Sequence, residues 1–146
     1  MNNIKNMTKG EFTKYSNELV LTLLEKQGFN FSKIIDGKCR TKFNVSQSYN
    51  IKIAGYRYNE KVSGNYAYVL KKDFDIINEK YLYFVLYIDK VSHILKIPSS
   101  VFINPAPNSA FKNRDYVGKK SLPEYGIVMN KNTLKELLMY EENCLQ

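Results

Sequence analysis

The chain has 146 residues, of which 44% are hydrophobic, enough for one packed core in one domain. Its longest apolar run, residues 81–88, is far shorter than the roughly 20 residues of a membrane-spanning helix, and no apolar leader follows Met1, so we expect a cytoplasmic protein. Two cysteines, Cys39 and Cys144, exclude a disulfide scaffold, and the formal net charge of +8 favours an acidic partner.

The first predicted element is a helix over residues 9–27. Residues 8–11 have the form of a capping box, with Thr8 as the N-cap and Glu11 three positions later. Apolar side chains then recur at helical spacing along one face, which Glu18 flanks. Gly28 stands where a glycine commonly ends a helix.

The next forty residues change to the two-residue period of β-strands. The expected elements are, in order, a strand over 31–35, a tight turn at Asp36-Gly37, a strand over 39–45, a turn at 46–48, a strand over 49–58, a polar loop over 59–65 and a strand over 66–70. On the longest of these strands, Asn50 and Lys52 point to one face because side chains alternate. Gly55 on the same strand predicts a bulge or a close backbone contact.

The second half predicts further strands and a closing helix. The expected elements are a strand over 81–88, a turn at Asp89-Lys90, a strand over 92–97, a single helical turn over 98–102, a long surface loop over 104–126 that holds three of the four prolines, and a helix from the cap Asn130 to about 142. The order predicts a single α+β domain, ordered over 8–142, with a mixed, largely antiparallel sheet flanked by an N-terminal and a C-terminal helix.

The positive charge is concentrated in one segment. Residues 33–72 contain nine Lys and Arg against two acids, which gives that segment a net charge of +7. Tyrosines interrupt the cations, and this mixture suits a polyanion with stackable bases. The predicted nucleic-acid contacts are Lys38, Arg40, Lys42, Tyr56, Arg57, Tyr58, Lys61, Lys71 and Lys72.

A second pattern suggests phosphodiester chemistry. Glu18 lies on the first helix, Asp36 lies at a strand turn, and Asn50 precedes Lys52 by two positions on a strand. Cleavage assisted by Mg²⁺ needs two or three oxygen ligands and a lysine near the attacked phosphate. The candidate metal ligands are therefore Glu18, Asp36 and Asn50, and the candidate catalytic residue is Lys52.

This layout resembles the PD-(D/E)XK superfamily of restriction-endonuclease-like nucleases. The resemblance rests on residues 49–57 at the metal-site strand, 81–88 as the buried strand, 95–102 after it and 125–130 before the closing helix. It implies a restriction-endonuclease-like fold and a metal-dependent phosphodiesterase with Mg²⁺ as cofactor. Asn50, however, stands where the family has an acidic residue or Gln, and Asp36 sits in a turn.

The favoured interpretation is thus a nuclease-like fold with a decayed site that binds DNA or RNA. An intact nuclease and an unrelated fold are the alternatives. A different class of function also fits the composition: a regulator or inhibitor from a mobile element would use a basic, Tyr-rich face against an acidic protein partner.

Overall fold

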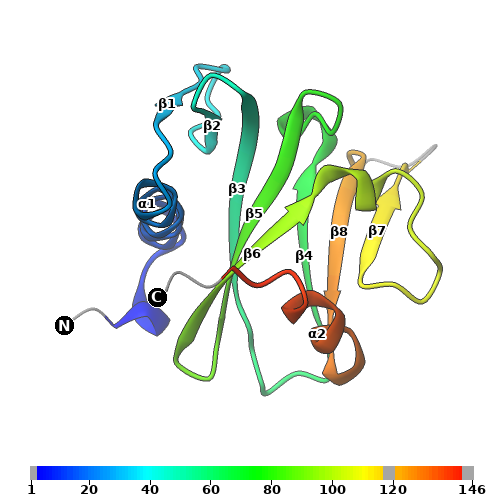
Figure 1. Ribbon diagram of the computed structural model, residues 1–146. Coiled ribbons are helices and arrows are strands. Elements are labelled where there is room, and N and C mark those ends of the chain that lie inside the picture. Colours follow the sequence, from blue (N-terminus) through cyan, green and yellow to red (C-terminus); the bar gives the residue numbers. More distant parts are fainter. Residues whose placement is uncertain (1–2, 117–120, 143–146) are drawn as a thin grey trace.

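The computed structural model describes residues 3–116 and 121–142, so Cys144 lies outside the described residues. Two sheets and two helices form one mixed α/β domain (Figure 1). The elements are, in chain order, η1 (Ile4–Asn6), α1 (Lys9–Lys26), β1 (Phe31–Lys33), β2 (Lys42–Val45), β3 (Tyr49–Arg57), β4 (Asn65–Leu70), η2 (Lys71–Asp73), β5 (Glu79–Ile88), β6 (Val91–Pro98), η3 (Ser99–Phe102), β7 (Phe111–Arg114), β8 (Glu124–Met129) and α2 (Lys131–Leu138).

Helix α1 forms where the sequence predicts it. The Glu11 N–H donates to Thr8 Oγ1 at 3.1 Å, and the Thr8 N–H donates to Glu11 Oε1 at 2.8 Å, so the capping box is confirmed. Gly28, with φ +88°, follows the end of the helix. The buried face of α1 packs on β3 and β5.

The first sheet has the strand order β1-β2-β3-β5-β6. All its neighbours are antiparallel except β3 and β5, which are parallel because the chain crosses over between them. The predicted turn at Asp89-Lys90 is confirmed, and both residues have positive φ, as a tight hairpin between twisted strands requires. Residues 82–86 of β5 are buried, which confirms that this strand is covered on both faces.

The remaining strands form a second sheet, in the order β4-β8-β7, where the sequence led us to expect a single sheet. The expected loop over 104–126 is also wrong in part, because it contains β7 and the first residues of β8. Pro123 directly precedes β8, and Pro105 and Pro107 lie in the segment before β7, so none of the three removes a ladder hydrogen bond. Phe111 on β7 is 2% exposed, so this segment belongs to the core.

The first sheet is covered differently on its two faces. Helix α1 covers one face, and the second sheet together with α2 covers the other (Figure 1). Ile51 and Ile53 of β3 face α1, and the alternate residues Ala54 and Tyr56 pack with the second sheet. Asn50 and Lys52 therefore also point away from α1.

Helix α2 begins at the predicted cap, since Asn130 Oδ1 accepts from the N–H groups of Asn132 and Thr133. It ends at Leu138 rather than near 142. The chain then pairs with β6, where the Lys96 N–H donates to the Tyr140 carbonyl and the Glu142 N–H donates to the Ile94 carbonyl. None of the helices in the described ranges is long and apolar enough to cross a membrane.

Candidate functional site

The predicted metal ligands do not come together. Glu18 is exposed on α1 and lines a shallow hollow with Asn3 and Asn6. This hollow lies on a different side of α1 from the face that packs against β3. Asn50 lies on the opposite face of the sheet, and its Oδ1 accepts from Asn44 Nδ2 at 2.9 Å. Residues 3–116 and 121–142 contain no group of three or more His, Cys, Asp or Glu placed to hold a metal ion.

The carboxylate of Asp36 contacts an ammonium group. Lys42 Nζ lies 2.7 Å from Asp36 Oδ2 and 3.4 Å from Glu79 Oε1, and the Lys42 and Glu79 side chains are buried. The hydrogen bond from Lys42, followed by its charge, lowers the pKa of Asp36 below the ordinary value. Lys42 was predicted to contact phosphate, but in this structure its charge is balanced inside the protein.

Lys52 lies directly across from Lys42 and has a different environment. It is 7% exposed, and its ammonium donates to Thr41 Oγ1 and, at 3.4 Å, to Cys39 Sγ. Burial raises the pKa of the Cys39 thiol, but hydrogen bonds from Thr41 and the positive charge of Lys52 outweigh it and lower that pKa overall. The carboxylates of Asp36 and Glu79 contact Lys42, and no ion pair within the described residues includes Lys52.

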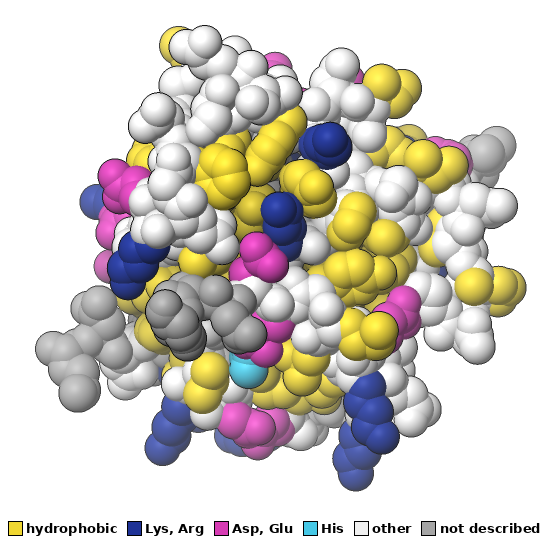
Figure 2. Space-filling view, in the orientation of Figure 1, with side chains coloured by type: hydrophobic (Ala, Val, Ile, Leu, Met, Phe, Trp, Pro, Cys, Tyr) yellow, Lys and Arg dark blue, Asp and Glu magenta, His cyan; other side chains and the backbone are white. Residues whose placement is uncertain are grey.

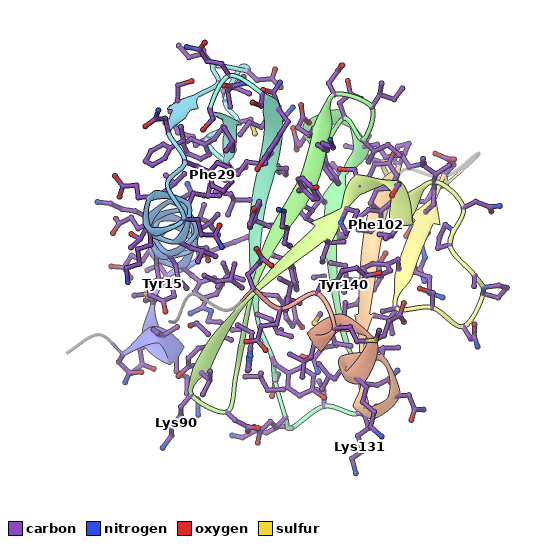
Figure 3. All side chains as sticks on the ribbon, in the orientation of Figure 1. Tyr15, Phe29, Lys90, Phe102, Lys131 and Tyr140 are labelled. Atoms are coloured by element: carbon purple, nitrogen blue, oxygen red, sulfur yellow. The ribbon has the colours of Figure 1, made fainter. Side chains whose placement is uncertain are left out.

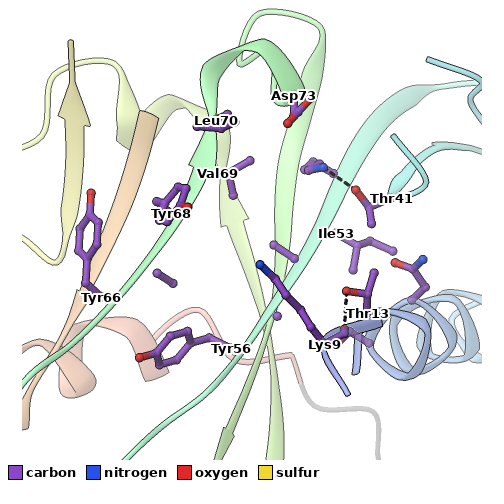
Figure 4. A pocket seen from close by; sticks show the side chains of 16 residues that line it. Lys9, Thr13, Thr41, Ile53, Tyr56, Tyr66, Tyr68, Val69, Leu70 and Asp73 are labelled. Carbon is purple, nitrogen blue, oxygen red and sulfur yellow. Dashed lines mark hydrogen bonds between the residues drawn. The ribbon is translucent and has the colours of Figure 1, made fainter. Parts of the chain in front are cut away.

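Lys52 lines a cleft of about 530 Å³ between α1, β3 and β4, which we name the β3–β4 cleft (Figure 4). Lys9, Thr13 and Ser16 line it from α1, and Tyr56 lines it from β3. In Figure 4 the ammonium of Lys9 points toward the middle of the cleft. Two lysines and one aspartate, Asp73, are the charged residues of its lining.

Two strand edges face each other across this cleft. Pairing between β2 and β3 stops at Lys52, after which the Ile53 N–H donates to the Thr41 carbonyl. The next stretch of β3, residues 54–57, has no partner strand on that side among the described residues. Strand β4 is itself the edge of the second sheet. Edges of this kind present N–H and C=O groups that are open to pairing.

One exposed tyrosine borders the cleft. Tyr68 is 58% exposed and stacks on Tyr66, with ring centroids 6.4 Å apart. Arg114 lies 4.7 Å from the centre of the Tyr66 ring, and the Tyr66 hydroxyl donates to Glu124. Alternation with the inward-facing Ala67 and Val69 is the sequence signal that identifies Tyr68 as outward-facing.

The two tyrosines predicted as contacts, Tyr56 and Tyr58, are partly buried against the core. The Tyr56 hydroxyl donates to Asn65 Oδ1 at 2.9 Å, and burial is the main reason that the pKa of Tyr56 is raised. Both rings therefore pack against the protein core, although Tyr56 also lines the cleft.

The other predicted cations divide into two groups. Arg57 donates to the Met7 carbonyl at 2.6 Å and lies 4.9 Å from the Phe12 ring centre, and Lys71 pairs with Asp115 at 2.9 Å. The side chains that remain exposed are those of Lys38, Arg40, Lys61 and Lys72.

The positive charges do not gather in one place. The β1–β2 connection, which carries Lys38 and Arg40, and the loop after β3, which carries Lys61, lie at opposite ends of the molecule (Figure 1). On the face shown in Figure 2, the Lys and Arg side chains are separated by hydrophobic and acidic ones. The charge that is contiguous in the sequence is thus distributed in space.

Comparison of the chain with protein-family models, with curated proteins and with solved structures found no match. The resemblance to the restriction-endonuclease-like nucleases therefore stays a prediction.

Proposed function

We propose that this protein binds single-stranded nucleic acid in the β3–β4 cleft and does not cut it. The observation that carries the proposal is Lys52, a buried lysine at the wall of an open cleft with no carboxylate against it. Burying an ammonium that forms no ion pair is costly, so a site of this kind favours an anion. A phosphate group of a nucleic acid is the anion that best suits a basic, tyrosine-bordered cleft.

The size of the cleft favours a single strand over a duplex. About 530 Å³ is in the range of small-ligand sites, which suits one or two nucleotides of an extended strand. Lys9 in the cleft lining supplies a second cation, and the exposed ring of Tyr68 offers a surface on which a base can stack. Arg40 lies close by, because its carbonyl accepts from Asn17 of the cleft at 3.3 Å.

Lys42 supports binding without cleavage. Its ammonium holds Asp36 and Glu79 together, and Lys52 adds a second positive charge on the neighbouring strand. A Mg²⁺ ion at this position would be repelled by two cations. The succession of α1, β1, β2 and β3, with Lys52 on β3, supports a restriction-endonuclease-like origin in which Lys42 has replaced the metal.

Fluorescence anisotropy with a labelled single strand of twelve nucleotides tests the proposal. If about four cations contact phosphates, the slope of log affinity against log salt concentration is expected to be about −3. Lys52→Met keeps the apolar stem of the side chain and is expected to weaken binding at least about tenfold. Lys131→Met removes a charge that extends from α2 into solvent (Figure 3) and serves as the matched control. A Lys52→Met variant that binds as tightly as the parent protein would exclude Lys52 as the phosphate contact.

The second part of the proposal is tested by incubating the same labelled strand, and a supercoiled plasmid, with Mg²⁺ or Mn²⁺. We expect no products from either. Cleavage that disappears in Asp36→Asn would show instead that an intact nuclease site forms around Asp36.

One observation favours a second candidate, the acidic protein partner. The open edges of β3 and β4 would pair with an extended segment of such a partner by β-strand addition. In that case an acidic, β-prone peptide would slow hydrogen exchange at the amides of Gly55 and Tyr68, and single strands would not bind.

A further inference from the structure

Two polar atoms that line the β3–β4 cleft have no partner within the described residues. They are Ser16 Oγ and Asn17 Oδ1, and both lie on α1. Ser16 is 1% exposed and lines the cleft, and its hydroxyl is buried. The Asn17 side-chain nitrogen donates to the Arg40 carbonyl at 3.3 Å, and this bond leaves Asn17 Oδ1 as a fixed acceptor. Buried polar groups without partners are uncommon in folded proteins.

Donors lie on the strand beside them. Lys52 has three ammonium protons, of which Thr41 and Cys39 accept two, so one remains. The Tyr58 N–H donates to the Tyr87 carbonyl of β5. Because successive residues of a strand direct their amides to opposite sides, Gly55 directs its N–H away from β5 and toward the cleft.

Gly55 also brings the strand close to α1. A Cβ atom at this position would lie 2.6 Å from Ser16 Oγ, so only glycine allows the serine hydroxyl to rest against the strand backbone. Ser16 and Gly55 are thus in contact, Asn17 is the next residue of the helix, and Lys52 lines the same cleft; we name these four residues the Ser16 niche. It offers three hydrogen-bond donors and, next to them, one acceptor.

We propose that the Ser16 niche binds one ribose-phosphate unit and makes the protein prefer RNA to DNA; this inference rests on the single-strand binding proposed above. A phosphodiester accepts hydrogen bonds but donates none, so it satisfies Ser16, Gly55 and Lys52 and leaves Asn17 Oδ1 without a partner. The ribose 2′-hydroxyl supplies the missing donor, and deoxyribose has none. The niche thus recognises a phosphate through its donors and the sugar through Asn17.

Two oligonucleotides of ten uridines, one of ribose and one of deoxyribose, separate these contacts because their bases are the same. The parent protein is expected to bind the RNA about five- to tenfold more tightly than the DNA. Asn17→Ala removes the acceptor for the 2′-hydroxyl and also the bond to the Arg40 carbonyl, so it is expected to weaken RNA binding more than DNA binding and to bring the two dissociation constants to the same value. A circular-dichroism spectrum equal to that of the parent protein shows that the variant is folded.

Ser16→Ala removes a phosphate contact, and we expect it to weaken the binding of RNA and the binding of DNA by the same factor. Thr22→Ala alters an exposed position of the same helix and is the matched control, with no change expected. Equal affinities of the parent protein for the two oligonucleotides would overturn the inference and leave the proposed function standing. An RNA preference that survives in Asn17→Ala would overturn it as well. If neither oligonucleotide binds, the proposed function fails together with the inference.

Discussion

Lys42 and Lys52 lie opposite each other on β2 and β3, and both are buried, but they differ in what surrounds them. Lys42 contacts two carboxylates, whereas Lys52 contacts a hydroxyl and a thiol. A buried ammonium that has carboxylate partners contributes to the fold, and one without them is available to a ligand. We therefore assign Lys42 to stability and Lys52 to binding.

This assignment predicts opposite effects on stability. Lys42→Met leaves the buried carboxylate of Glu79 without its cation and is expected to cost about 3–5 kcal/mol of unfolding free energy. Lys52→Met removes a buried charge that forms no ion pair within the described residues, and its free energy of unfolding is expected to equal or exceed that of the parent protein. Urea denaturation, with Lys131→Met as the control, measures both. An equal loss of unfolding free energy in Lys42→Met and Lys52→Met would contradict the assignment.

The ion pair of Asp36 predicts a pH dependence. The hydrogen bond from Lys42 and its charge lower the pKa of Asp36 in the folded protein below its unfolded value of about 4. The pair therefore stabilises the fold above that unfolded value, and this contribution is lost as the pH falls through the folded pKa. Asp36→Asn should be less stable than the parent protein at pH 7, and the difference should disappear as the pH is lowered toward 2. Thermal melts across this pH range would contradict the account if the difference stayed constant.

At the scale of elements, the contact between α1 and β3 determines the shape of the cleft. Gly55 allows the helix to approach the strand so closely that an added Cβ would meet both Ser16 Oγ, at 2.6 Å, and Phe12 Cε2, at 2.8 Å. Phe12 is buried and also packs under Arg57, so it has little room to move. The position of α1 therefore depends on a residue without a side chain.

Gly55→Ala tests this dependence. We expect it to push α1 away from β3, to destabilise the protein by roughly 1–3 kcal/mol and to weaken single-strand binding. Gly10→Ala, at a helix position where an added Cβ meets nothing within 4 Å, is the control and should leave binding unchanged. A Gly55→Ala protein with parental stability and affinity would show that this close approach is not needed.

Local signals explain which elements the sequence could predict. The capping box of Thr8, the turn at Asp89-Lys90 and the cap at Asn130 act within a few residues, and the structure confirms all three. The division into two sheets depends on pairing between β4 and β8, which are separated by more than fifty residues and have no local signature. The prolines that precede β7 and β8 led to the prediction of a loop, because a proline near a strand cannot be told from a proline in a loop by sequence alone.

At the scale of the whole molecule, the distribution of charge differs from its order in the sequence. The segment 33–72 holds most of the net charge, but Lys42 and Lys71 pair with carboxylates, and Arg57 bonds to the N-terminal segment. Which cations remain available depends on contacts between distant residues, and composition does not report these. The sequence could not predict the cleft for the same reason, because α1, β3 and β4 meet only in the folded chain.

The most direct test of the proposed cleft is an amide-shift titration of the isotope-labelled protein with a short single strand of uridines. The account predicts saturable shifts at the amides of Ser16, Gly55 and Tyr68, and none along α2. Shifts confined to Lys38 and Arg40 on the β1–β2 connection, or no shifts at all, would contradict the claim that the β3–β4 cleft binds the strand.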